Sequence, residues 1–224
     1  MRRFRVSKAM HVRFQNRIKA GKFLAGRLVR YTGRTDVIVL GLPRGGVPVA
    51  AGIATALGVA LDALAVGKPG PTKVADARSG GASRVLSHPA IDSVQVSATD
   101  RSRAPATEPG DPARREQPVR EARPAAAVRG RTVILVDDGI ATGATMRAAV
   151  ESTRRNGARY IVVAAPVAAR ESYLELRQLC DELIVVMAPR ELGRLGEYYA
   201  DFSPATDHEI REMLAGAQLQ HLPG

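Results

Sequence analysis

The feature that most constrains this chain is an apolar run that ends in two adjacent aspartates and a loop of small residues. Val133 to Val136 are all β-branched or leucine, which is typical of a strand buried on both faces of a parallel sheet. Asp137 and Asp138 follow, and the segment 139–145 consists of Gly, Ala, Thr and one Ile. Residues 146–156 have a helix-forming composition. The stretch therefore predicts a strand, a polar loop and the start of a helix.

This arrangement has a chemical meaning, because the first backbone N–H groups of a helix lack partners and face the positive end of the helix dipole. A loop of small residues lets a phosphate approach them, and the hydroxyls of Thr142 and Thr145 add donors. Asp137 and Asp138 would repel a phosphate unless they serve sugar hydroxyls or a Mg²⁺ ion on the same ligand. The predicted ligand is a phosphorylated sugar with free hydroxyls. The alternative is an ordinary strand-to-helix turn with a threonine cap.

The run Val-Asp-Asp-Gly-Ile-Ala-Thr-Gly-Ala-Thr, residues 136–145, resembles the phosphoribosyl-pyrophosphate (PRPP) signature of the type I phosphoribosyltransferases. The resemblance implies that Asp137 and Asp138 hold the ribose 2′- and 3′-hydroxyls, as catalytic residues. It implies that Mg²⁺ is the cofactor, carried by PRPP and reached by the two aspartates only through it. It also implies that the following loop binds the substrate through Gly139, Ala141, Thr142, Gly143, Ala144 and Thr145.

A second motif follows an earlier strand, predicted over Asp36–Leu42, and reads Pro-Arg-Gly-Gly-Val-Pro. Arg44 offers a guanidinium fork, and Gly45 and Gly46 offer exposed backbone amides, which together suit a pyrophosphate. In the type I family this position is the pyrophosphate loop, and the sequence Leu-Pro-Arg-Gly-Gly-Val-Pro-Val-Ala is close to that of a bacterial subfamily. The resemblance assigns Arg44 to stabilising the departing pyrophosphate.

A further strand is predicted over Leu61–Val66, followed by Gly67 and Lys68. Relatives usually carry a basic residue before this lysine, where the chain has glycine. Lys68 is therefore the remaining candidate for a contact with pyrophosphate, and a loop lysine without a role is the alternative.

The strands and helices alternate along the chain, which predicts parallel pairing with right-handed crossovers. We expect an α/β fold, an open and mostly parallel twisted sheet flanked by helices; the resemblance adds a small hood made from the N- and C-terminal segments. The expected organisation is a single domain over 1–224, with a basic arm and helix in 1–34 and a hood segment in 188–214. Half of the fourteen prolines fall in 71–124, which is predicted to be an irregular or partly disordered insert.

Three of the nine aromatic residues lie close together near the C-terminus, at Tyr198, Tyr199 and Phe202. In the type I family the hood near this point contacts the accepting base. We therefore name Tyr198 and Tyr199 as candidate substrate-binding residues on which a planar base could stack. Local core packing is an equal alternative. A last helix is predicted to start with Asp207 as its cap.

Composition and charge restrict the partners and the cellular location expected for this protein. Residues 1–34 hold eleven Lys and Arg and no acid, whereas the rest of the chain has 22 residues of each sign. This segment predicts a helix over His11–Tyr31 with a cationic side, which suits a solvated face, an oligomer contact or RNA binding. The single cysteine, Cys180, favours a reducing compartment, so we expect a cytoplasmic protein. No apolar run is long enough to cross a bilayer, so no membrane partner is expected.

Three functions remain open. The first is a phosphoribosyltransferase, a glycosyltransferase that uses Mg-PRPP, releases pyrophosphate and acts as a homodimer on an unidentified acceptor, expected to be a nitrogenous base. The second is a PRPP-binding regulator with little catalysis that contacts RNA through its basic arm, and the third is a degenerate relative that acts as an interaction protein. Ala141 stands where family members that use 6-oxopurines carry an acid, which argues against hypoxanthine and guanine as acceptors.

Overall fold

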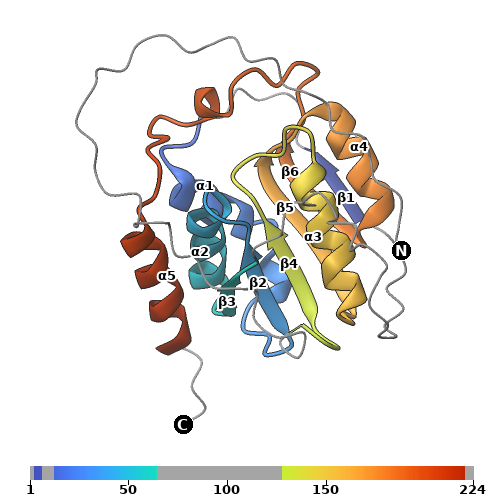
Figure 1. The fold of residues 1–224 in the computed structure, drawn as a ribbon, viewed down its shortest axis with the longest axis vertical. Helices are drawn as coiled ribbons and strands as arrows, with labels where there is room; N and C mark the ends of the chain where they lie inside the picture. The colour runs from blue at the N-terminus through green and yellow to red at the C-terminus, as the bar shows by residue number, and fades with distance from the viewer. Residues whose placement is uncertain (1–2, 7–12, 65–127, 220–224) are drawn as a thin grey trace, which may run out of the picture. The chain divides into compact units, whose positions relative to one another are not determined.

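A six-stranded parallel sheet forms the centre of the structure, a computed structural model that describes residues 3–6, 13–64 and 128–219 (Figure 1). The strand order is β1-β6-β5-β4-β2-β3, and all neighbouring pairs run parallel. The strands are Arg3–Val6 (β1), Val37–Gly41 (β2), Ala60–Ala63 (β3), Thr132–Val136 (β4), Tyr160–Val167 (β5) and Glu182–Met187 (β6). The expected α/β fold with an open parallel sheet is confirmed.

Helices cover both faces of this sheet (Figure 1). Successive residues of a strand point to opposite faces, so Val37 and Val39 pack in one core with α1 and α2, while Ile38 and Leu40 pack in another with α3 and α4. Helix α5 packs beside α2 and β3. The helices are Arg17–Ala25 (α1), Gly46–Leu57 (α2), Ala144–Arg155 (α3), Arg170–Leu179 (α4) and Asp207–Leu219 (α5), with 3₁₀ turns at Val29–Tyr31 (η1) and Leu195–Tyr198 (η3).

The pairing of β2 with β4 positions the two predicted motifs. Val37 lies opposite Thr132 and Gly41 lies opposite Val136, so both strands end at the same edge of the sheet. The backbone N–H of Leu42 then donates to the carbonyl of Val136. The loops that follow β2 and β4 are therefore neighbours, at the edge where open α/β sheets bind ligands.

The basic N-terminal segment differs from its prediction. Arg3–Val6, in the segment expected to be a basic arm, form an edge strand beside β6. The single helix expected over 11–31 is shorter, because the side chain of Asn16 accepts a hydrogen bond from the Lys19 N–H and starts α1 at Arg17. Ile18 in α1 is 37 % exposed.

The N- and C-terminal segments pair with each other, as a hood made from both would require. The N–H of Phe14 donates to the carbonyl of Tyr198, and the N–H of Ala200 donates to the carbonyl of Phe14. Farther along, α5 starts with a capping box in which Thr206 and Glu209 bond each other's backbone N–H groups. The predicted cap at Asp207 was therefore wrong by one residue.

The described helices and strands belong to one compact unit made of residues 1–67 and 118–224. Lys68 and the predicted insert 71–124 lie outside the described residues. Within the described part of the chain, no helix is long and apolar enough to cross a membrane.

Two glycines allow α1 and α2 to pack closely. A Cβ atom at Gly21 would overlap the carbonyl of Val49, and one at Gly52 would overlap the carbonyl of Ile18. These obstacles are backbone atoms, so neither helix can yield by rotating a side chain.

We therefore expect Gly52→Ala to lower the free energy of unfolding by about 1–3 kcal/mol, because it forces the two helices apart. Urea denaturation would measure the loss. The control is Gly26→Ala, since Gly26 has φ −59° and its nearest obstacle to a Cβ is 3.4 Å away. Equal stability of both variants would contradict the close packing.

Candidate active site

The two adjacent aspartates directly follow β4, at the carboxyl edge of the sheet. The N–H of Asp138 donates to Oδ1 of Asp137 at 2.9 Å, which fixes one carboxylate against the next backbone group. Asp138 is only 8 % exposed. The hydroxyl of Tyr199 donates to the backbone carbonyl of Asp138, so the hood segment holds this turn in place.

The loop after the aspartates ends at the N-terminus of α3. Gly143 occupies the N-cap position with φ +72°, a left-handed conformation that favours glycine, and it has no side chain to cap the helix. Four residues of this loop have exposed side chains: Ala141, Thr142, Ala144 and Thr145. The N–H of Ala144 donates to the hydroxyl of Thr142 over a long 3.4 Å, and Gly143 itself supplies no cap, so the helix tip is only weakly capped.

Two side chains of α3 and α4 donate hydrogen bonds to backbone carbonyls of this loop. Ser172 of α4 donates its hydroxyl to the carbonyl of Ala141 at 2.6 Å, and Arg147 of α3 donates to the carbonyl of Thr142 at 2.9 Å. Gly139 is buried against the side chain of Leu195, so the hood segment rests on the start of the loop. Sequence patterns gave no sign of Ser172 or Arg147, because neither lies in a motif.

The second glycine motif lies against the two aspartates. A Cβ atom at Gly45 would overlap the carboxylate of Asp138, and one at Gly46 would approach the Cα of Asp137 to 3.0 Å. The nearest obstacle at Gly45 is a side chain that Arg17 holds in place. The nearest obstacle at Gly46 is the backbone carbonyl of Val136, so glycine permits both close approaches. The tertiary structure thus brings together the loops that follow β2 and β4.

Arg44, in the same loop, is exposed and points to the last helix. Its guanidinium lies 3.4 Å from Oδ1 of Asp207, with half of the arginine side chain accessible. Such exposed pairs contribute little to stability. Arg44 can therefore reorient at low cost.

Arg17 is a member of the site that the sequence showed only as part of a cationic helix. Its Nε donates to Oδ2 of Asp138 at 2.8 Å, and its Nη1 donates to the carbonyl of Ser203 at 2.8 Å. The guanidinium also lies 3.8 Å from the ring centroid of Phe202. One side chain from α1 therefore connects the aspartate loop to the C-terminal segment.

Asp137, the acid next to Asp138, has a raised pKa. Burial, together with the adjacent charge of Asp138, raises the pKa of Asp137 to about 8. Asp138 instead has the guanidinium of Arg17 as its partner. Burial and the adjacent charge both disfavour a negative charge on Asp137, so this carboxyl holds a proton more readily than a free aspartate.

Tyr199 does not offer a stacking surface, which corrects its assignment as a base-binding residue. It is 1 % exposed, and its ring packs between those of Phe14 and Phe202 at centroid distances of 5.9 and 5.1 Å. Tyr198 is half-buried and donates its hydroxyl to the carbonyl of Leu192. For Tyr199, core packing, the other alternative from the sequence, is what the structure shows.

A metal ion fits this site only together with a ligand. The described residues contain no group of three His, Cys, Asp or Glu side chains that could hold one. Mg²⁺, however, commonly takes one or two carboxylates and completes its shell with water and phosphate oxygens. Asp137 and Asp138 provide such carboxylates beside an exposed helix tip, so the donor set suits a metal that arrives with a phosphorylated substrate.

Comparison with known families shows to which family this chain belongs. The profile of the family described as "Phosphoribosyl transferase domain" matches residues 12–189. This chain belongs to the phosphoribosyl transferase family. The resemblance to type I phosphoribosyltransferases is thereby confirmed, and the family indicates an enzyme of the glycosyltransferase type.

Individual relatives support the assignment of this chain to the phosphoribosyl transferase family. The Mycobacterium tuberculosis protein named "Putative phosphoribosyl transferase Rv0571c" is 34 % identical over 201 residues, which are 88 % of this chain and 45 % of that protein. The chain thus spans less than half of the length of this curated relative. Among solved structures, TT1426 from Thermus thermophilus is 30 % identical with a TM-score of 0.60, covering 92 % of this chain and 99 % of its own. AQ2163 from Aquifex aeolicus, at 11 % identity and a TM-score of 0.51, covers 89 % of this chain and 99 % of its own and shares the fold.

The protonation of Asp137 predicts a pH dependence of stability. The folded protein keeps this proton up to about pH 8, whereas the unfolded chain loses it near pH 4, so the free energy of unfolding falls as the pH rises between these values. Asparagine does not titrate. The Tm of Asp137→Asn relative to wild type should therefore rise between about pH 5 and pH 8, at ~2–4 °C per kcal/mol.

Asp201 provides the matched control, because hydrogen bonds from Ser203 lower the pKa of its exposed carboxyl. The relative Tm of Asp201→Asn should not rise over the same pH range. A parallel rise in both variants would contradict the raised pKa of Asp137.

The ion pair between Arg17 and Asp138 predicts a coupled loss of stability. Both side chains are nearly buried, at 12 % and 11 % exposure, so Arg17→Met leaves a buried carboxylate without its partner. The free energy of unfolding should fall by about 3 kcal/mol in urea denaturation. In the Asp138→Asn background the same change should cost much less; strictly additive losses would show that the two side chains do not interact.

Proposed function

We propose that this chain binds Mg-PRPP and transfers its phosphoribosyl group to a nitrogenous base, with release of pyrophosphate. One observation carries the proposal: the loop with Gly45 lies directly against the carboxylate of Asp138. The resemblance assigns one of these loops to pyrophosphate and the other to the ribose phosphate. A single PRPP molecule needs both in one place.

Each part of the site would meet a different part of PRPP. The aspartates would accept hydrogen bonds from the ribose hydroxyls, and the α3 tip from Gly143 to Thr145 would bind the 5′-phosphate. The amide of Gly45 would face the pyrophosphate, and Arg44 would turn from Asp207 to join it. The N–H of Gly46, expected from the sequence to be a second donor, instead donates to the carbonyl of Leu42 at 2.9 Å. Bound Mg²⁺ would neutralise part of the pyrophosphate charge.

The reaction breaks the bond between the anomeric carbon and the pyrophosphate oxygen and forms a bond to the acceptor nitrogen. Positive charge develops on the ribose in the transition state, close to the carboxylate of Asp138. Donors that are already positioned for the leaving pyrophosphate lower the barrier, because they need not reorganise during the reaction. Arg17 would act as a positioning residue, since its Nε donates to Oδ2 of Asp138 and holds that carboxylate in place.

The proposed acceptor is a nitrogenous base. Ala141 argues against a 6-oxopurine, and half-buried Tyr198 stays a candidate contact for a base in the hood. Contact of Lys68 with pyrophosphate, assembly as a homodimer and a cytoplasmic location also stay predictions. The expected single-domain organisation, with its insert and hood, belongs with them.

The first test is binding of Mg-PRPP by calorimetry. A hydrogen bond to a charged group contributes about 1.5–3 kcal/mol, so Asp138→Asn should raise the Kd by about ten- to a hundredfold. Glu151→Gln is the control, because this exposed acid of α3 pairs with Arg155 on the helix surface. Equal Kd values for both variants and wild type would remove PRPP from the proposal.

A second assay separates transfer from binding alone. Pyrophosphate release is followed with wild-type protein, Mg-PRPP and a panel of purine, pyrimidine and pyridine bases. Release that depends on one base identifies the acceptor. Tight binding without release for any base would favour a PRPP-binding regulator over an enzyme.

A further inference from the structure

A cavity lies at the edge of the sheet opposite the two aspartates, where the parallel strands begin. Its volume is about 510 Å³, within the size range of small-molecule sites. It is lined by Arg30, Tyr31, Arg34, Thr132, Arg159 and Tyr160. Three of these six residues are arginines and none is an acid.

This cavity is separate from the candidate active site. Thr132 is the first residue of β4, and Asp137 follows its last residue. At about 3.3 Å per residue, the two sites are roughly 16 Å apart along the strand. A small ligand in one would not touch the other.

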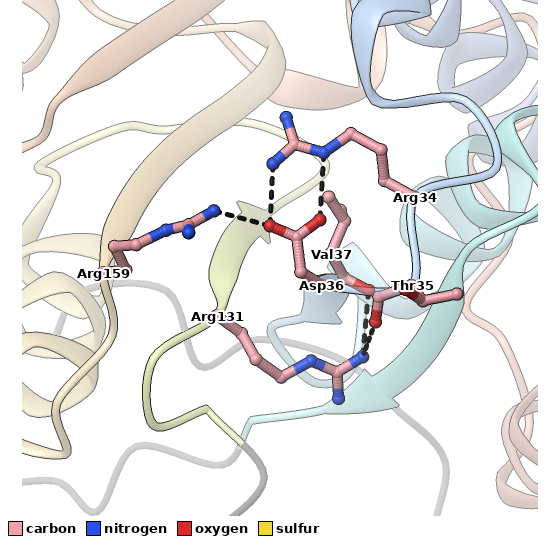
Figure 2. A network of polar contacts seen from close by, with 6 residues as sticks. All are labelled: Arg34, Thr35, Asp36, Val37, Arg131 and Arg159. Carbon is pink, nitrogen blue, oxygen red and sulfur yellow. Dashed lines mark hydrogen bonds and ion pairs between the residues drawn. The ribbon is translucent and has the colours of Figure 1, made fainter.

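Asp36 organises two of the arginines at the cavity. Arg34 binds it through Nε and Nη2, at 3.0 and 2.8 Å, and Arg159 approaches from the other side at 2.6 Å (Figure 2). The hydrogen bond from Arg34 lowers the pKa of the Asp36 carboxyl, so the acid keeps its charge. Arg131 donates to the carbonyls of Thr35 and Val37, which places a further guanidinium beside the same loop (Figure 2).

A buried acid organises the third arginine of the cavity. Glu182 is 1 % exposed, accepts a hydrogen bond from the Tyr31 hydroxyl at 2.7 Å and forms an ion pair with Arg30. The guanidinium of Arg30 lies 4.8 Å from the ring centroid of Tyr31, and that of Arg34 lies 5.5 Å from it. The arginines are therefore held in place before any ligand binds.

The three arginines that line the cavity outnumber the two acids that hold them. Arg30 pairs with Glu182, whereas Arg34 and Arg159 share the single carboxylate of Asp36. A guanidinium has five N–H donors, and the described contacts of Arg34 and Arg159 use only a few of them. Oriented guanidinium groups with spare donors match the oxygens of a phosphate.

We propose that this cavity is a second binding site, specific for a small phosphate monoester such as a sugar phosphate. Such a group carries ~1.5–2 negative charges at neutral pH, which suits a cavity whose lining is cationic. Arg34 and Arg159 bind the phosphate, and Tyr160 and Thr132 border the space for the organic part. The concave shape and the limited volume favour this ligand over an RNA strand, which would need an extended surface.

The experiment uses ribose 5-phosphate as the probe and calorimetry at low ionic strength. Because the α3 tip would also bind a phosphate, the measurements are made in the Thr145→Glu background, which blocks that tip. Binding should persist there. It should weaken at least tenfold after Arg159→Ala, a change at a side chain that is 60 % exposed and that the folded core does not need.

Lys22→Ala/Arg155→Ala is the control for overall charge, since both side chains are exposed and outside the cavity. It should bind the probe like its parent. Equal affinity in the Arg159→Ala variant, or no binding once the α3 tip is blocked, would overturn the proposal. So would binding of an RNA oligonucleotide that depends on Arg159 while ribose 5-phosphate does not bind.

Discussion

The register between β2 and β4 is the constraint on which the candidate site depends. Because Gly41 pairs with Val136, the two strands end together and their loops leave the sheet side by side. Gly45 then meets Asp138, a close approach that glycine permits. A shift of one residue would also exchange the two faces of a strand, so the two apolar cores that hold the register also hold the site.

At both ends of the sheet, charged side chains pair with side chains of the opposite charge. At the carboxyl edge, Arg17 balances Asp138, and the adjacent Asp137 keeps its proton because a second buried charge would be costly. At the amino edge, Asp36 and Glu182 balance part of a larger arginine cluster. The carboxyl edge combines two aspartates with an exposed helix tip, whereas the amino edge gathers arginines. The first would suit a phosphorylated sugar with its hydroxyls and metal, and the second a phosphate group alone.

The N-terminal segment links these two ends. It supplies Arg17 to the carboxyl edge and Arg30 and Arg34 to the amino edge. The basic residues of this segment are therefore not simply a solvated helix face, because each of these arginines has an acidic partner. Arg17 and Arg30 pair with acids far away in the sequence, and Arg34 pairs with an acid of its own loop. The pairing of Phe14 with the segment around Tyr199 ties the same region to the C-terminal hood.

The sequence by itself determined β2 and β4, the alternation of strands and helices, and the two loop motifs, because apolar runs and small-residue turns act over a few neighbouring positions. It did not reveal β1, which forms by pairing with β6 at the edge of the sheet. It could not reveal the partner of Asp138, the burial of Tyr199 or the cluster around Asp36. Those depend on side chains such as Arg17, which is 121 residues from Asp138 and in no motif with it. Only the tertiary structure decided them, since long-range pairs are set by how helices pack on the sheet and leave no local pattern.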